Sequence, residues 1–156
     1  MSKATPATRV LDRAGVAYAL HRYEYEPAPG RIGLQAAERL GVDPGQVFKT
    51  LMVLVDGQPF CAVLPSDREA SLKQLARAAG GKAAQMMVPA AAERLTGYRI
   101  GGVSPLGQRK ATPVFIEAAA LAHDQIFVNG GQRGLQIRLA PRDLITTLGA
   151  QSAVFT

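Results

Sequence analysis

Lys49 is the charged side chain most in need of an explanation, because it lies inside a strongly apolar segment. It follows Phe48 and precedes Leu51, Val53 and Val55, and apolar residues on both faces are typical of an interior strand. With a two-residue period, Lys49 shares a face with those last three residues. Its ammonium group either reaches water at the end of the strand or binds a carboxylate, phosphate or carbonyl group in a pocket. Lys49 is therefore the first candidate for a functional residue.

A glycine-rich segment from Gly101 to Gly107 is the second candidate. The pair Gly101 and Gly102 lets ligand atoms approach the backbone, and successive N–H groups can bind an anion or an oxyanion. Ser104 has little support as a nucleophile, because no Gly-x-Ser-x-Gly sequence surrounds it and no histidine is placed beside it as a base. The alternative is a turn that needs glycine geometry and the rigid Pro105.

A second glycine-rich segment, Gly130-Gly131-Gln132-Arg133-Gly134, carries a guanidinium group. Arg133 in this position could bind a phosphate at the rim of a pocket. The alternative is a hairpin connection with a solvated arginine. Both glycine segments therefore leave a purely structural explanation open.

The other reactive side chains favour structural roles. His21 shares a strand face with Tyr23, where a lone histidine is more often structural than catalytic, and His123 falls in an expected loop. Cys61, the only cysteine, is expected to be a small buried apolar residue, and the Met86–Met87 pair is expected to fill the core. One cysteine and two histidines exclude an intrachain disulfide and leave too few ligands for a zinc cluster. No metal and no cofactor are expected.

The elements that would position these residues are short helices interleaved with hairpins. Asp56-Gly57 is typical of a tight hairpin turn, and Ser66 and Asp67 are expected to cap a helix that ends before Gly80. No G-x-G-x-x-G or P-loop sequence supports a nucleotide-cofactor fold. This order favours an α+β fold with a mixed, mainly antiparallel sheet. The expected helices are 6–14, 34–40, 67–79, 89–95 and 142–148, and the expected strands are 16–25, 47–55, 59–64, 113–118, 125–129 and 134–139.

The length and composition of the chain are those of a globular protein rather than a disordered or membrane-spanning one. The chain has 156 residues, of which 47% are hydrophobic and 19% charged, and this is typical of one globular domain, here 1–156. The longest run without a charged residue, 144–156, is too short to span a bilayer, and no apolar segment follows Lys3 as in a secretory signal. We expect a soluble cytoplasmic protein that does not bind membranes. Because no long apolar helix face or heptad is visible, we also expect a monomer.

The positive charge of the chain favours an acidic partner. Eighteen basic residues, thirteen of them arginine, outnumber twelve acidic ones and give a net charge of +6. Arginine suits phosphate groups and stacked bases better than lysine does. A dispersed positive charge fits either a polyanion such as RNA or simple solubility.

Four segments occur in one order along the chain: Val47–Leu51, Thr96–Tyr98, Gly101–Gly107 and Gly130–Leu135. With this ordered set, the chain closely resembles the YbaK/EbsC family, whose YbaK-type members are Cys-tRNA(Pro) deacylases, over essentially its whole length. The resemblance implies a curved mixed sheet with surrounding helices, related to the editing domain inserted in many bacterial prolyl-tRNA synthetases. It also implies a trans-editing enzyme, without a cofactor, that clears tRNA(Pro) mischarged with cysteine by prolyl-tRNA synthetase.

The resemblance also implies roles for particular residues. Lys49 matches an essential lysine and would contact the terminal ribose or phosphate, while the cysteinyl thiol of the substrate attacks its own ester carbonyl and leaves as a thiolactone. Because the substrate supplies the nucleophile, the enzyme needs only to orient the ester and stabilise the oxyanion. The substrate-binding residues would be Tyr23, Phe48, Gly101, Gly102, Ser104, Pro105, Gly130, Gly131, Arg133 and Gln136.

Gln136 departs from the family pattern, because a well-known member has an aspartate after the Arg-Gly-Leu sequence. Glutamine can still form hydrogen bonds, but it cannot act as a base. The amino acid removed stays open between cysteine and another small residue such as alanine on tRNA(Pro), and Cys-tRNA(Cys) is a further candidate substrate. The other class of function is a non-catalytic module that binds a nucleotide or the end of a tRNA. A transient complex with prolyl-tRNA synthetase is expected, because no tRNA-reading appendage is evident.

Overall fold

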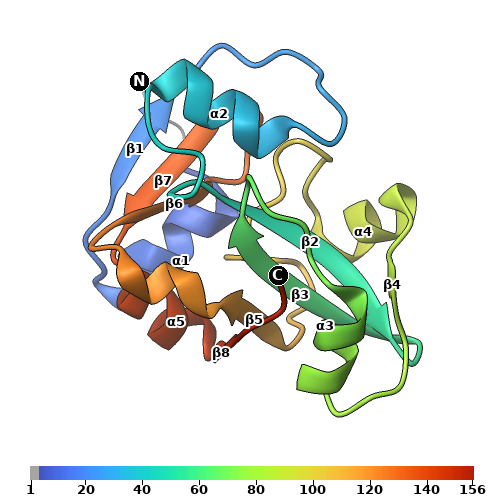
Figure 1. The fold of residues 1–156 in the computed structure, drawn as a ribbon. Coiled ribbons are helices and arrows are strands. Elements are labelled where there is room, and N and C mark those ends of the chain that lie inside the picture. The colour runs from blue at the N-terminus through green and yellow to red at the C-terminus, as the bar shows by residue number, and fades with distance from the viewer. Residues whose placement is uncertain (1–3) are drawn as a thin grey trace.

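The computed structural model describes residues 4–156, so Met1–Lys3, on which part of the expectation about a secretory signal rests, lie outside the described residues. Figure 1 shows the arrangement of the elements. The helices are α1 (Pro6–Ala14), α2 (Ile32–Leu40), α3 (Leu72–Ala78), α4 (Pro89–Thr96), α5 (Pro141–Leu148) and the 3₁₀ helix η1 (Ala118–Ala122). The strands are β1 (Ala19–Arg22), β2 (Phe48–Val55), β3 (Gln58–Pro65), β4 (Ala84–Met86), β5 (Val114–Glu117), β6 (Ile126–Asn129), β7 (Leu135–Leu139) and β8 (Gln151–Ala153).

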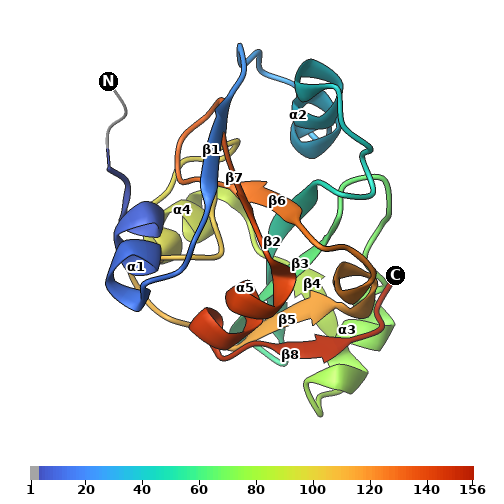
Figure 2. The same cartoon turned by 90° about the vertical axis from the view of Figure 1, so that its left-hand side faces the viewer.

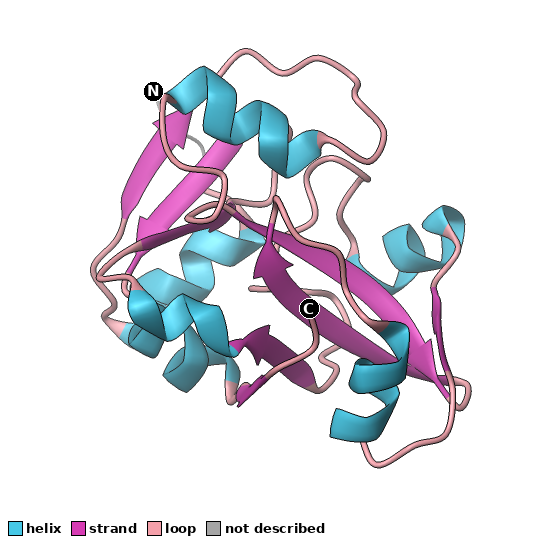
Figure 3. Ribbon diagram, viewed as in Figure 1, coloured by secondary structure: helices cyan, strands magenta, loops and turns pink. Residues whose placement is uncertain are grey.

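Two sheets form the framework (Figure 3). One sheet has five strands in the order β4-β2-β3-β5-β8, and the other has three strands in the order β1-β7-β6. The β1–β7, β6–β7, β2–β3 and β2–β4 pairs are antiparallel, whereas the β3–β5 and β5–β8 pairs are parallel. The expected α+β class with mixed, mainly antiparallel pairing is confirmed, and the strands are divided between two sheets.

The β2–β3 hairpin confirms the hairpin expected from the sequence. Asp56 (φ 48°) and Gly57 (φ 81°) both have left-handed backbone conformations, as a two-residue hairpin turn of this kind requires. The turn sets a register in which Lys49 lies opposite Leu64. The place of Lys49 in the sheet is therefore fixed by turn chemistry at the far end of its strand.

Apolar side chains cover both faces of the five-stranded sheet. Phe48 and Met52 of β2 belong to a core that also includes residues of α1, α4, α5 and the three-stranded sheet. Val53 and Val55 belong to a second core with α3 and Phe155. Figure 2 shows α1 and α3 on opposite sides of β2, β3 and β5. Successive residues of β2 therefore lie on opposite faces of the sheet, as the two-residue period predicts.

Helix α2 packs where the two sheets meet. Ala36 and Ala37 contact Val47 and Phe127, which themselves form a single parallel bridge between the start of β2 and β6. A Cβ on Gly33 of this helix would lie 2.5 Å from the Cβ of Ser66, so only glycine allows this approach to the end of β3. The helix is thereby held close to the first residues of β2.

The helix expected over 67–79, with Ser66 and Asp67 as its cap, begins instead at Leu72, with Ser71 as its N-cap. The Ser66 hydroxyl donates a hydrogen bond to the Pro44 carbonyl at 2.7 Å, so it serves a tertiary contact and is not available as a cap. The expected cap by Asp67 is also wrong, because the chain forms a turn at residues 66–67 and becomes helical only at Leu72.

Two further expectations are corrected at sheet edges. The strand expected over 16–25 contracts to the four residues of β1, which are the ones that pair with β7. Met86, expected in the core, lies in the edge strand β4 and is 48% exposed. The strands β4 and β8 have three residues each, too few to give a periodic signal in the sequence.

Candidate functional site

The start of β2 has an open edge between two neighbouring segments. On one side, the Phe127 N–H donates to the Gln46 carbonyl at 3.0 Å, and β6 leaves the strand there. On the other, β4 pairs only with the end of β2, and the contact nearest the start is the Met87 N–H donating to the Met52 carbonyl at 3.0 Å. Alternate residues of a strand direct their backbone groups to the same side, so the N–H and C=O of Thr50 face the gap.

A cavity of about 300 Å³ surrounds this open edge. It takes side chains from both faces of β2. Further walls come from α2, from α4 and the segments before and after it, from the end of β6 and from the start of β7. The lining residues are Gly30, Ile32, Gly33, Leu34, Phe48, Lys49, Thr50, Leu51, Met52, Ser66, Met86, Met87, Pro89, Ala92, Ile100, Gly101, Val103, Asn129 and Gln136.

Lys49 is half-buried in the wall of this cavity, on the strand face predicted for it. Burial lowers the pKa of its ammonium group, and the carboxylates of Glu69 and Asp67 oppose part of that shift. Within residues 4–156, the ion pair that the structure contains joins Arg39 and Glu26 and does not involve Lys49. A half-buried cation of this kind is available to bind a phosphate, carboxylate or polarised carbonyl group.

Two of the six buried side-chain polar atoms without a partner among the described residues, those of Thr50 and Gln136, belong to the cavity lining. Gln136 is 2% exposed, and its Oε1 has no hydrogen-bond partner among the described residues. The same holds for Oγ1 of Thr50, which also lines the cavity, and for the hydroxyl of Tyr23. Burial raises the pKa of Tyr23, and the side chain of Gln136 lies near enough to oppose part of the shift. Tyr23 and Gln136 lie within reach of each other, whereas Thr50 Oγ1 has no such neighbour. Buried polar atoms are rarely left unpaired, so Thr50 Oγ1 fits a polar ligand.

Asn129 joins the two glycine-rich segments behind the cavity. Its Oδ1 accepts a hydrogen bond from the Gly131 N–H at 2.7 Å, and its Nδ2 donates to the Gly101 carbonyl at 3.2 Å. The sequence did carry a signal for this residue, because an asparagine side chain often binds the backbone two residues further on. Asn129 thus positions Gly101 in the cavity wall.

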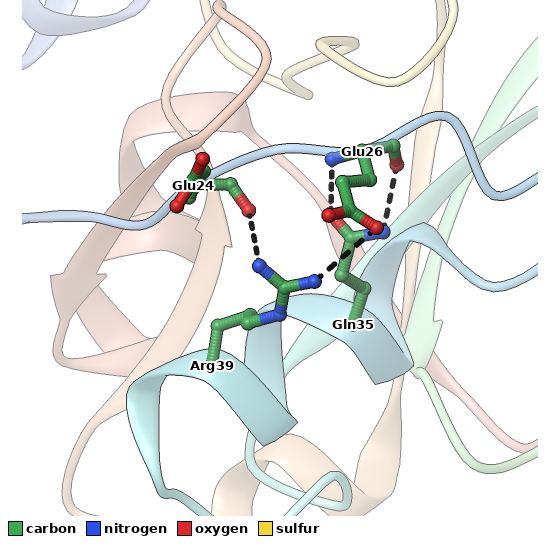
Figure 4. A network of polar contacts seen from close by, with 4 residues as sticks. All are labelled: Glu24, Glu26, Gln35 and Arg39. Atoms are coloured by element: carbon green, nitrogen blue, oxygen red, sulfur yellow. Dashed lines mark hydrogen bonds and ion pairs between the residues drawn. The ribbon is translucent and has the colours of Figure 1, made fainter.

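A polar network fixes the opposite wall (Figure 4). Gln35 of α2 exchanges two hydrogen bonds with the backbone of Glu26, at 2.7 and 2.9 Å. Arg39 donates to the Glu24 carbonyl at 3.0 Å and forms an ion pair of 3.5 Å with Glu26. These contacts tie the segment after β1 to α2, whose first turn lines the cavity.

The first glycine-rich segment contributes one glycine to the cavity and uses the other for packing. Gly101 lines the cavity, whereas the Gly102 N–H donates to the Arg99 carbonyl at 2.8 Å. A Cβ on Gly102 would lie 2.9 Å from the backbone nitrogen of Arg133, so glycine lets the two glycine-rich segments touch. Of the two N–H groups expected to bind an anion, that of Gly102 is therefore already used within the loop, and that of Gly101 is the candidate that remains.

Ser104 and Pro105 belong to the same segment but lie outside the cavity lining. Ser104 is fully buried, and its Oγ accepts a hydrogen bond from the Leu106 N–H at 3.2 Å. Its carbonyl accepts another from the Gln108 side chain at 3.0 Å. These contacts support the loop rather than bind a ligand, in agreement with the alternative that the sequence left open.

The second glycine-rich segment also lies outside the lining. The Gly130 carbonyl accepts a hydrogen bond from the Thr5 hydroxyl at 2.6 Å. Arg133 is exposed, its Nε donates to the Ile100 carbonyl at 3.0 Å, and its guanidinium carbon lies 5.4 Å from the ring centre of Tyr25. The guanidinium group is near the rim of the cavity, where a phosphate contact was expected.

The structure thus gathers part of the expected site and adds residues that the sequence did not indicate. Of the residues expected from the sequence, Phe48, Lys49, Gly101 and Gln136 line the cavity, whereas Tyr23 adjoins it. The additional polar residues are Thr50, Ser66 and Asn129, and the additional apolar ones include Met86, Met87 and Ile100. No local pattern in the sequence could separate these methionines from core residues.

The chemistry available in the cavity is binding and polarisation. Among the described residues that line it there is no histidine or cysteine. Cys61 is fully buried in β3, and burial raises its pKa to about 12, which suppresses the thiolate. Residues 4–156 also contain no group of three His, Cys, Asp or Glu side chains placed to hold a metal ion, and no helix long and apolar enough to cross a membrane.

Known proteins are similar to this chain over nearly all of it. Residues 33–147 match the family model described as the aminoacyl-tRNA editing domain. The Enterococcus faecalis protein EbsC, named as a Cys-tRNA(Pro)/Cys-tRNA(Cys) deacylase, is 35% identical over 154 residues, which are 97% of this chain and 93% of EbsC. The crystal structure of the hypothetical protein APE2540 has a TM-score of 0.87 at 25% identity and covers 97% of this chain and 99% of its own. A structure described as a trans-editing enzyme for prolyl-tRNA synthetase has a TM-score of 0.81 at 25% identity, with 99% of both chains covered.

Proposed function

Because this chain belongs to the aminoacyl-tRNA editing domain family, we propose that it is a trans-editing deacylase that cleaves the ester bond of Cys-tRNA(Pro). The observation that carries the proposal is the cavity at the open edge of β2, with a half-buried lysine and unpartnered polar atoms but no histidine or cysteine among the described lining residues. Such a site can hold and polarise an ester. Its described lining offers no thiol or imidazole to attack one, and the Ser66 hydroxyl is already bound to the Pro44 carbonyl.

The missing nucleophile can be supplied by the substrate itself. The thiol sulfur of the cysteinyl group attacks its ester carbonyl, so a C–S bond forms, the C–O bond to the ribose breaks, and the thiol proton ends on the ribose hydroxyl. The cyclic thiolactone that leaves is later opened by water. The tasks left to the protein are to fold the aminoacyl group into a reactive geometry and to stabilise the developing oxyanion.

Each of these tasks has a candidate residue. Lys49 would bind the terminal ribose or phosphate and hold the ester in place. Gly101, positioned by Asn129, would direct its N–H toward the oxyanion. Gln136 and Tyr23 would bind polar groups of the aminoacyl moiety, with Gln136 acting as a neutral hydrogen-bonding group where a carboxylate would be charged.

The proposal also covers the domain, its oligomeric state, its compartment and its recognition of tRNA. We infer one editing domain over residues 1–156, acting as a monomer in the cytoplasm, where its substrate is made. Recognition of the correct tRNA would come from a transient complex with prolyl-tRNA synthetase. The similarity to EbsC, whose name includes Cys-tRNA(Cys), supports cysteine as the amino acid and modest discrimination between tRNAs by the protein alone.

The test is deacylation of Cys-tRNA(Pro), Ala-tRNA(Pro), Pro-tRNA(Pro) and Cys-tRNA(Cys) by the purified protein. Rapid loss of cysteine from both tRNAs, with thiolactone trapped before it hydrolyses, is the expected result. Loss of alanine instead would keep the reaction class and reject the thiol-assisted mechanism. No loss from any substrate, together with measurable binding of tRNA, would favour a non-catalytic module that binds the tRNA end.

A further inference from the structure

Exposed apolar side chains are concentrated at the mouth of the cavity. Met86 is 48% exposed, Val88 65% and Ile100 41%. Met86 and Ile100 line the cavity, and Val88 lies between two residues that do. The two other large apolar residues exposed to a similar degree, Leu121 and Val154, do not line it. We name Met86, Val88 and Ile100 the apolar rim.

The rim is held in place before any ligand arrives. The Ile100 N–H donates to the Glu93 carboxylate at 2.9 Å, and the Ile100 carbonyl accepts from Arg133 Nε at 3.0 Å. An exposed isoleucine whose peptide groups are both bound by charged side chains is preorganised, which lowers the entropy lost on binding. Met86 lies in β4, which pairs with β2, so this part of the rim is also built on a regular element.

We propose that the apolar rim is the binding site for the unpaired nucleobase at the 3′ end of the RNA. The proposal rests on the proposed function: the aminoacyl group is esterified to the terminal ribose, so when it enters the cavity the attached base must lie at the mouth. A base has two apolar faces that stacking or apolar contact can cover regardless of its sequence. The exposed guanidinium groups of Arg99 and Arg133 lie in the two loops beside Ile100, where the preceding phosphates would pass.

This arrangement separates two kinds of recognition. The cavity would select the amino acid, whereas the rim would select an RNA end without reading the rest of the tRNA. The positive charge of the two loops favours a nucleic acid as the occupant over a protein surface that has no acidic side chains. A protein partner at the rim is the competing explanation, and the experiment distinguishes it.

The experiment compares Ile100→Ser and Met86→Ser with the matched control Leu121→Ser, which removes an equally exposed apolar residue away from the cavity. With Cys-tRNA(Pro), each rim variant should raise KM roughly five- to tenfold with kcat nearly unchanged, the size expected for a lost apolar contact, while the control is unaffected. With cysteine methyl ester, which has no base, Val88→Ser, the rim variant whose residue does not itself line the cavity, should behave as wild type, and so should its equally exposed control Val154→Ser. An equal effect on the methyl ester, or no effect on KM, would overturn the proposal.

A binding measurement keeps the proposal testable if the protein proves not to be a deacylase. The RNA trinucleotide CCA should bind the wild-type protein more tightly than the same oligomer with an abasic 3′ nucleotide, and Ile100→Ser should remove the difference. Equal affinity for both oligomers would overturn the assignment. So would a rim variant that loses affinity for prolyl-tRNA synthetase but not for CCA, because the occupant would then be a protein.

Discussion

The two halves of β2 have the same partner on one side and different neighbours on the other. Both halves pair with β3 along the whole hairpin. At the end of the strand, β4 pairs with 53–55, and Val53 and Val55 are buried in the core. At the start, Lys49 and Thr50 are half-buried and face a cavity instead of a strand.

The difference shows how a sheet can provide a site without a dedicated loop. An open strand edge is normally a liability, because its free N–H and C=O groups recruit other strands. Here the opening is flanked by β6 and β4, and residues of α2 and α4 line the cavity beside it. Unpaired backbone groups and a lysine are then presented to a small ligand. The end of the strand serves stability, and the start serves function.

The largest effect is expected from Lys49→Ala in the functional half. Deacylation kcat/KM should fall by roughly 10²- to 10³-fold, the loss seen when one preorganised electrostatic contact is removed. Stability should not fall, because burial lowers the pKa of Lys49, which means that the fold disfavours its charged form. Steady-state kinetics and thermal unfolding check this, with the exposed Lys73→Ala as control. Near-wild-type turnover by Lys49→Ala would contradict the assignment of the catalytic lysine.

Val53→Ala in the other half should have the opposite consequences. Val53 is fully buried, so the loss of two methyl groups should lower the free energy of unfolding by about 2 kcal/mol. The kcat of the folded fraction should stay close to that of wild type. Urea denaturation and kinetics below the transition measure the two quantities. A fall in kcat comparable to that of Lys49→Ala would mean that the halves are not functionally separate.

The sequence predicts what depends on local chemistry. Asp56-Gly57 fixes the hairpin and thereby the register of Lys49, and the helix expected over 6–14 is confirmed as α1, with Thr5 as its N-cap. The alternation of β2 correctly assigns Lys49 to the face of Leu51 and Val53. These features follow from a few neighbouring residues, so no tertiary information is needed.

The gap itself cannot be predicted in this way. It depends on a single bridge between Val47 and Phe127, which are eighty positions apart, and on a three-residue strand whose last residue, Met86, pairs with Val53 and so ends before it can cover Thr50. The same reason explains the glycine-rich segments. Their sequences indicate close backbone approach, which the structure contains, but Gly102 approaches another loop rather than a ligand.

A smaller effect is expected from Thr50→Val, which removes a buried hydroxyl without changing the shape of the side chain. Because Oγ1 of Thr50 has no partner among the described residues, stability should be unchanged or higher by up to about 1 kcal/mol. KM for Cys-tRNA(Pro) should rise by about three- to tenfold if the substrate pairs with this hydroxyl. Thr112→Val is the matched control, because Thr112 has a similar unpartnered hydroxyl outside the cavity lining. Equal kinetics for the two variants would remove Thr50 from the site.

The smallest effect on activity is expected from Cys61→Ala, although Cys61 lies opposite Met52 at the boundary between the two halves. Its thiol is fully buried with a pKa of about 12, so it cannot supply a thiolate to the cavity at neutral pH. The variant should lose about 1 kcal/mol of stability through the small void and keep kcat to within about twofold. Reaction of the native thiol with a disulfide reagent should be slow until the protein unfolds. A stable Cys61→Ala protein without deacylase activity would place the nucleophile on the enzyme, and the substrate would no longer be needed to attack itself.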